Sequence, residues 1–147
     1  MANNKTPIGG AGGGGAPPVI NVYPPGTTLD TEAVKYSAQA SGALSAHKFV
    51  IVTSSGLAYA DKNTLSQQDK ILGMTITSAA AAGDPIDVVT SGKVSDPSLS
   101  FVAGAVYLNT AGGYTQVRPT SGLWVVVGMA IDANTIDINI QLPVVLA

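Results

Sequence analysis

From about residue 34 onward, apolar and polar positions alternate along the chain. The clearest case is Asn134–Ile140, where every second residue is isoleucine and the residues between are polar. A period of two is typical of a strand that buries one face. The pattern therefore predicts β structure rather than helix for this part of the protein.

Further runs rich in β-branched residues lie next to turn signals and predict more strands. They are His47–Thr53, Leu57–Ala60, Lys70–Thr77, Pro85–Thr90, Lys93–Val94, Ala105–Asn109, Tyr114–Val117 and Leu123–Ile131. Helix signals are weak: Thr64–Lys70 suffices for one turn with Thr64 as N-cap. We predict an all-β, small antiparallel β-barrel or sandwich over Val34–Ala147, with less than about a tenth of it in α-helix against the usual third.

The sequence Gly-Met-x-Ile occurs twice, at Gly73–Ile76 and Gly128–Ile131. Each copy follows a hairpin pattern and precedes a strand that contains an aspartate, Asp87 or Asp137. This order predicts two similar β units, each with one apolar face, that pack face to face. The glycine of each copy is expected at a bulge or a bend.

The apolar positions of the strands predict the core. Its expected members are Phe49, Ile51, Leu72, Met74, Ile76, Val88, Val106, Leu108, Val125, Val127, Met129, Ile136, Ile138 and Ile140. A domain of about 110 residues hides only roughly two-thirds of its unfolded-chain surface, so we expect a homo-oligomer. Leu142, Val144, Val145 and Leu146 lack polar alternation and are the predicted oligomer interface.

Residues 1–33 differ in composition, with six glycines within residues 9–15 and proline pairs at 17–18 and 24–25. Such chain offers little to bury and resists ordering. Its apolar cluster, Val19, Ile20, Val22 and Tyr23, is the predicted anchor of an extended arm that binds a partner surface. A disordered tail is the alternative.

Composition narrows the chemistry further. The 147 residues include no Cys and one His, and the net charge is −2. The lack of Cys excludes disulfides, thiolate nucleophiles and zinc fingers, and one His excludes a multi-histidine metal site. We expect no basic face that could bind nucleic acid. The longest apolar run is also far shorter than the about 18 residues that a membrane-spanning helix needs. We expect no cofactor and no enzymatic activity.

The remaining candidates for chemistry have structural interpretations that we favour. Gly10–Gly15 matches G-x-G-x-x-G but lacks the strand before it and the helix after it that phosphate binding needs. His47 is expected at a surface or strand edge, and the aspartates beside turns are expected to bond turn backbone. Tyr107, Tyr114 and Trp124 suit a core or subunit interface better than a sugar platform.

Several hairpin and turn motifs carry a resemblance. They are residues 88–94 (VVTSGKV), 104–109 (GAVYLN), 112–116 (GGYTQ), 119–122 (PTSG), 126–130 (VVGMA), 136–138 (IDI) and 142–143 (LP). In these motifs about residues 44–146 resemble virion proteins of tailed bacteriophages, among them small capsid decoration proteins and head or tail fibre proteins.

The resemblance implies a structural module, usually trimeric, mounted on a virion. We expect a capsid decoration, or cement, protein that is made in the host cytoplasm, binds the major capsid protein on the outer shell and stabilises it. The alternative is a fibre or receptor-binding appendage. Short length favours decoration, because a fibre normally has a long trimeric shaft. Neither reading has a nucleic-acid or membrane partner.

Overall fold

The structure is a computed structural model that describes residues 23–146. It consists of short strands and one turn of 3-10 helix, η2 (Leu65–Gln67). The strands are β2 (Thr28–Leu29), β3 (Val34–Gln39), β4 (Phe49–Thr53), β5 (Gly56–Tyr59), β6 (Ile71–Thr75), β7 (Pro85–Ser95), β8 (Gly104–Leu108), β9 (Tyr114–Thr115), β10 (Gly122–Trp124), β11 (Val126–Asp132), β12 (Thr135–Asn139) and β13 (Val144–Leu146). The described residues contain no α-helix, so the all-β prediction is confirmed.

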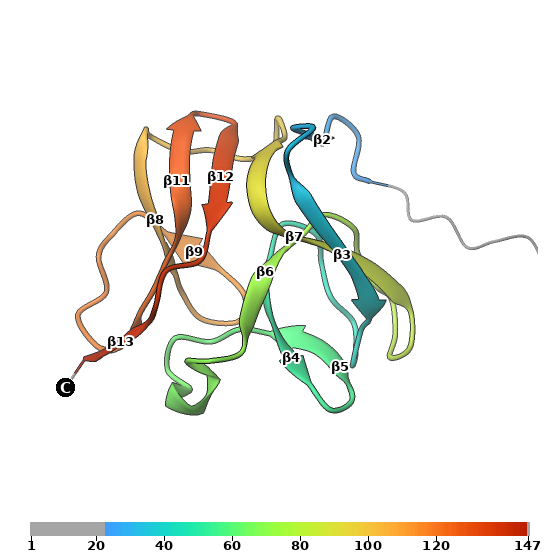
Figure 1. The fold of residues 1–147 in the computed structure, drawn as a ribbon, viewed down its shortest axis with the longest axis horizontal. Coiled ribbons are helices and arrows are strands. Elements are labelled where there is room, and N and C mark those ends of the chain that lie inside the picture. Colours follow the sequence, from blue (N-terminus) through green and yellow to red (C-terminus); the bar gives the residue numbers. More distant parts are fainter. Residues whose placement is uncertain (1–22, 147) are drawn as a thin grey trace, which may run out of the picture.

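The main sheet is antiparallel and curls into a half-barrel, with β8, β11 and β12 on one side and β4, β5 and β6 below (Figure 1). Its strand order is β5-β4-β6-β7-β12-β11-β8-β9. Read from the middle outward, both halves have the same plan: a central strand, then an inner strand, then a hairpin. The two predicted β units are therefore present, the first made by β4 to β7 and the second by β8, β9, β11 and β12.

The long strand β7 joins the units. Its residues Val88–Val89 pair with β6, and Ser91–Ser95 pair with β12. The same strand also pairs with β3 and with the short β2. Strand β2 lies within the segment predicted as an arm, so the last part of that segment is paired with the sheet. The cluster residues Val19, Ile20 and Val22 lie outside the described residues.

The two Gly-Met-x-Ile copies occupy equivalent places. Gly73 stands opposite Val50, Gly128 stands opposite Val106, and a register shift precedes each glycine. An added Cβ would lie 2.1 Å from the carbonyl oxygen of Val89 at Gly73 and 2.4 Å from that of Asp137 at Gly128. Glycine is thus required in both units because the neighbouring backbone occupies the side-chain space.

The same register corrects one detail of the repeat. Met74 stands opposite Val89 and Met129 stands opposite Asp137, so Val89 and Asp137 are the equivalent residues. The match of Asp87 with Asp137 read from the sequence is wrong by two positions. Residues two apart on a strand share a face. The sequence match therefore chose the correct face of β7 but the wrong cross-strand partner.

Each unit has two faces, which we call front and back. In the first unit the front residues Phe49, Met74 and Ile76 belong to the main core, whereas the back residues Val50 and Val88 belong to a second, smaller core. The second core also holds Ala40 and Leu44, from the chain that follows β3. Strand β3 and this chain therefore cover the back of the first unit.

In the second unit the faces are used the other way round. Val106 and Ile136, the equivalents of Val50 and Val88, lie in the main core. Met129, the equivalent of Met74, is 50% exposed, so its predicted place in the core is wrong. The units thus pack front to back rather than face to face. Leu72 and Ile140 are only partly buried, and the other expected core residues are buried.

The glycine requirement is testable. We expect Gly73→Ala and Gly128→Ala each to lower the free energy of unfolding by about 1–3 kcal/mol, because the methyl group overlaps a carbonyl oxygen of the next strand. Gly42→Ala is the matched control, since an added Cβ there meets nothing within 4 Å, and it should stay within about 0.5 kcal/mol of the parent. Urea unfolding measures all three, and equal midpoints would contradict the close approach.

Candidate assembly interface

A line of apolar side chains points outward along β10 and β11. Trp124 and Val126 are half-buried, whereas Met129 and Ile131 are 50% and 45% exposed. The residues between them, Val125, Val127 and Ala130, are buried in the main core, and the spacing changes at the register shift before Gly128. The outward-facing apolar side chains therefore begin on β10 and follow β11, the strand that carries Met129 and Ile131 on the front of the second unit.

The C-terminal strand extends this line. Strand β13 pairs with β10, which sets Val144 opposite Trp124. Trp124, Val126, Gln141, Leu142 and Val144 line a groove of about 260 Å³, in which Leu142 is 91% exposed. We call the set Trp124, Val126, Met129, Ile131, Leu142 and Val144 the outer stripe.

The stripe is flanked by polar and aromatic groups. Tyr107 stands opposite Val126 on β8, and Lys93 stands opposite Asp137 beyond Met129. The guanidinium of Arg118 lies 4.0 Å from the centre of the Trp124 ring. Indole Nε1 of Trp124 is enclosed and has no hydrogen-bond partner within the described residues. An apolar centre with a polar, Arg- and Tyr-containing rim is the usual anatomy of a protein interface.

The four residues predicted as the oligomer interface divide into two pairs, one within the outer stripe and one outside it. Leu142 and Val144 join the outer stripe, whereas Val145 is 46% exposed beside Leu123 in the β10–β13 pair, and Leu146 is half-buried. Sequence reasoning missed Met129 and Ile131 as surface residues. Both residues belong to the second Gly-Met-x-Ile copy, so the repeat marks them as equivalents of Met74 and Ile76. Only the packing of the two units shows that the first copy is buried and the second is exposed.

Tyr23, the one described member of the predicted arm anchor, packs against the main core. Its hydroxyl accepts a hydrogen bond from Lys35 Nζ at 2.9 Å, and the same ammonium lies 5.4 Å from the ring centre. Lys35 also pairs with Asp87 at 3.3 Å. Tyr23 therefore contacts its own barrel in this structure.

A second cluster of polar groups surrounds Asp96, a buried residue just after β7. Its carboxylate accepts hydrogen bonds from the Thr27 hydroxyl, from Ser98 N at 2.8 Å and from Ser98 Oγ at 2.6 Å. His47 Nε2 lies 3.6 Å from Asp96 Oδ2 and 3.4 Å from Thr27 Oγ1. The cluster therefore links three segments: Thr27 just before β2, Asp96 just after β7, and His47 just before β4.

This cluster has the residue types of a catalytic triad but not its geometry. A triad needs the carboxylate on one ring nitrogen and the nucleophile on the other. Here both Thr27 and Asp96 approach Nε2 of His47. The backbone of His47 also has a positive φ of 59°, which is uncommon outside glycine. His47, expected at a surface or strand edge, lies partly buried just before β4, where its backbone N–H donates to Thr75 O. Its geometry suits a structural role.

The cluster changes two pKa values. Burial lowers the pKa of His47, against the opposing effect of the Asp96 carboxylate. Burial acts to raise the pKa of Asp96, but the hydrogen bonds from Ser98 and Thr27 and the nearby His47 outweigh it, so the pKa is lowered. In the folded state both groups therefore resist protonation.

Other aspartates bond turn backbone as expected. Asp61 accepts from Asn63 N at 2.8 Å, Asp84 accepts from Ala81 N at 3.0 Å, and Asp132 accepts from Asn134 N. Among residues 23–146 there is no group of three or more side chains suited to hold a metal ion. A helix able to cross a membrane is likewise missing from this part of the chain.

Comparisons with known proteins yield no family, relative or fold neighbour: no family model, curated protein or solved structure matches the chain.

The two pKa shifts predict how stability depends on pH. Below about pH 6.5 the unfolded state protonates His47 while the folded state resists, so stability falls from there toward the lowered folded pKa. Asp96 adds a further loss below its unfolded pKa of 3.8, toward its own lowered folded pKa. His47→Asn tolerates the positive φ and should flatten the loss between about pH 6.5 and 5, where ordinary carboxylates titrate little.

Chemical denaturation at half-unit pH steps measures this difference. The chain has a single His, so no other imidazole contributes to the parent's slope. An unchanged slope in His47→Asn would show that the cluster does not couple protonation to folding.

Proposed function

We propose that the protein is a non-enzymatic structural module that works by assembly, and that the outer stripe is the interface through which copies of the chain associate. The observation that carries the proposal is the unequal use of two equivalent faces. In the first unit Met74 and its neighbours form the main core against the second unit. In the second unit the equivalent front is exposed.

A second copy is the occupant that suits this face. The stripe combines Met129 and Ile131 on β11 with Leu142 and Val144 at the chain end. Exposed apolar patches of this kind mark interaction sites in soluble proteins. The chain already buries the same front in its first unit against β structure. Because both backs are covered within the chain, the exposed front of a second copy is the apolar β surface that remains to pack against it.

The resemblance of residues 44–146 to phage virion modules supports the kind of assembly. We propose a homo-oligomer, most simply a trimer, that decorates the outside of a capsid through the major capsid protein. The exposed residues Leu142, Val144 and Val145 are available for the extra contacts such a role needs, and we propose that the N-terminal segment adds to them. A fibre or receptor-binding appendage is the second candidate, and the polar grooves described below favour it.

The interface is tested with a single charge. Met129→Lys places a cation opposite Asp137, so the folded monomer should tolerate it. In an interface the buried ammonium should raise the dissociation constant of the oligomer by about tenfold or more. Val102→Lys is the control, because Val102 is 77% exposed and lies outside the stripe.

Sedimentation equilibrium across micromolar concentrations measures both variants. A monomeric parent, or a Met129→Lys variant that associates like the parent, would contradict the interface.

The role of the N-terminal segment is tested by truncation. Residues 1–22 are removed and residues 23–33 kept, because β2 pairs with β7 and Thr27 bonds Asp96. If Val19, Ile20 and Val22 bind the shell, the truncated protein should keep its oligomeric state but occupy capsids that lack the native protein less fully. Quantitative gel analysis of purified particles measures occupancy, and full occupancy at unchanged affinity would make the segment passive.

A further inference from the structure

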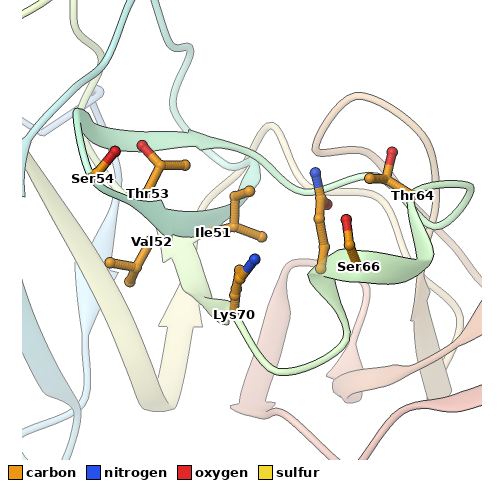
Figure 2. A pocket seen from close by; sticks show the side chains of 8 residues that line it. Ile51, Val52, Thr53, Ser54, Thr64, Ser66 and Lys70 are labelled. Atoms are coloured by element: carbon orange, nitrogen blue, oxygen red, sulfur yellow. The ribbon is translucent and has the colours of Figure 1, made fainter.

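A groove of about 420 Å³ lies between the end of the β4–β5 hairpin and the loop that carries η2 (Figure 2). Figure 2 shows Ile51, Val52, Thr53 and Ser54 along one side, Thr64 and Ser66 on the other, and Lys70 between them. Gln67 completes the lining. The volume falls within the roughly 300–1,000 Å³ of small-molecule sites.

The polar groups of the lining are mainly hydroxyls, with one amide and one ammonium. Within the described part of the chain the hydroxyls of Ser54, Thr64 and Ser66 make no hydrogen bond, although Thr64 precedes η2 where a capping bond would be usual. Gln67 Oε1 accepts from Asp61 N at 2.7 Å, which fixes the amide and leaves its NH₂ group to donate elsewhere. The groove therefore presents one fixed amide and three hydroxyls, which can donate or accept, beside the aliphatic side chains of Ile51 and Val52.

A second groove, of about 290 Å³, occupies the corresponding place in the second unit. It is lined by Asn109 at the end of β8, Thr115 on β9, residues 117–120 from the connection after β9, and Lys62. Asn109 is the equivalent of Thr53, because Val106 is the equivalent of Val50. The repeat has thus produced two polar grooves, each between a hairpin and the connection that follows it.

The grooves share one charge pattern. Lys70 lies in the first, Lys62 and Arg118 lie in the second, and none of the nine acidic residues lines either one. Ion pairs within residues 23–146 involve other cations, Lys35 and His47. In a chain of net charge −2, three positive charges without carboxylate partners therefore gather at two neighbouring grooves.

One short segment links the grooves. Lys62 lines the second groove and Thr64 the first, so the two are only two residues apart along the chain. The backbone of Lys62 is held on both sides, since its N–H donates to Asn109 O at 3.2 Å and its carbonyl accepts from Leu123 N at 2.7 Å. The two grooves therefore adjoin the same firmly held segment.

We propose that the paired grooves form a binding site for an acidic oligosaccharide, with Lys70, Lys62 and Arg118 facing its carboxylates. The hydroxyl and amide donors match sugar oxygens, and the aliphatic side chains match the C–H faces of the ring. A nucleic acid fits less well, because the groove linings contain no aromatic side chain on which a base would stack. The site adjoins the outer stripe at Arg118, which lies over Trp124, and sugar binding goes beyond the assembly role.

The experiment uses the full chain with three probes: tetragalacturonate, the neutral tetrasaccharide maltotetraose, and the oligonucleotide dT4. Amide chemical shifts in ¹⁵N spectra locate binding and give affinities. We expect tetragalacturonate to shift the amides of Ser54, Ser66, Lys70, Lys62 and Asn109 with a Kd of about 1 mM or tighter. Maltotetraose and dT4 should bind at least about tenfold more weakly.

Charge removal tests the residues. Lys70→Gln and Lys62→Gln should each weaken tetragalacturonate binding by about three- to fivefold, as for an exposed ion pair. Lys93→Gln removes an equal charge outside the grooves and should leave the affinity unchanged. Met129→Lys should also bind normally, so failure of the assembly interface and failure of this site give different results.

Three outcomes would overturn the proposal. They are shifts confined to other surfaces, equal binding of maltotetraose or dT4, and a Lys70→Gln variant that binds like the parent.

Discussion

The whole fold depends on hydrogen bonding to one strand, β7. It bonds to β6 and β12 within the two units and to β2 and β3, which precede the units in the chain. A strand of 11 residues is long enough to serve two partners in succession along its length. Strand β7 therefore joins the two units into one continuous sheet, in which the front of the first unit packs on the back of the second.

Front-to-back stacking leaves a structure with two unlike ends. At one end β3 and the chain around Ala40 and Leu44 cover the back of the first unit and build the smaller core. At the other end the front of the second unit has no cover within the described chain, and Met129 and Ile131 are exposed there. A stack that is capped at one end and open at the other resembles a repeat protein that has lost one terminal cap. The assembly role we propose uses that open end.

The buried polar groups mainly hold chain segments together by hydrogen bonds and ion pairs. The buried Asp96 carboxylate accepts hydrogen bonds from Thr27 and Ser98 and lies beside His47. This fixes Thr27, just before β2, beside the end of β7. The cations Lys62, Lys70 and Arg118 form no ion pair within residues 23–146, although Lys62 Nζ donates to Asn63 Oδ1 and Ser121 O and Arg118 lies over Trp124. Their charges are therefore the ones we assign to a ligand.

The sequence alone determined the strands, the repeat and most of the core. Alternation in Asn134–Ile140 and the two Gly-Met-x-Ile copies depend on local geometry: a strand exposes every second residue to the same side, and a glycine is needed wherever backbone approaches backbone. The alternation acts within one strand and the glycine requirement acts between neighbouring strands, and both leave a residue pattern that can be recognised in the sequence.

Only the tertiary structure decided which equivalent residues are buried. Met74 and Met129 have the same local pattern, yet one lies in the main core and the other on the surface, because burial depends on what packs against the strand. The Asp96 cluster and the paired grooves likewise bring together segments far apart in the sequence, such as Thr27 with Asp96 and Lys62 with Arg118. No local pattern records such contacts, since they are set by how the two units stack along β7.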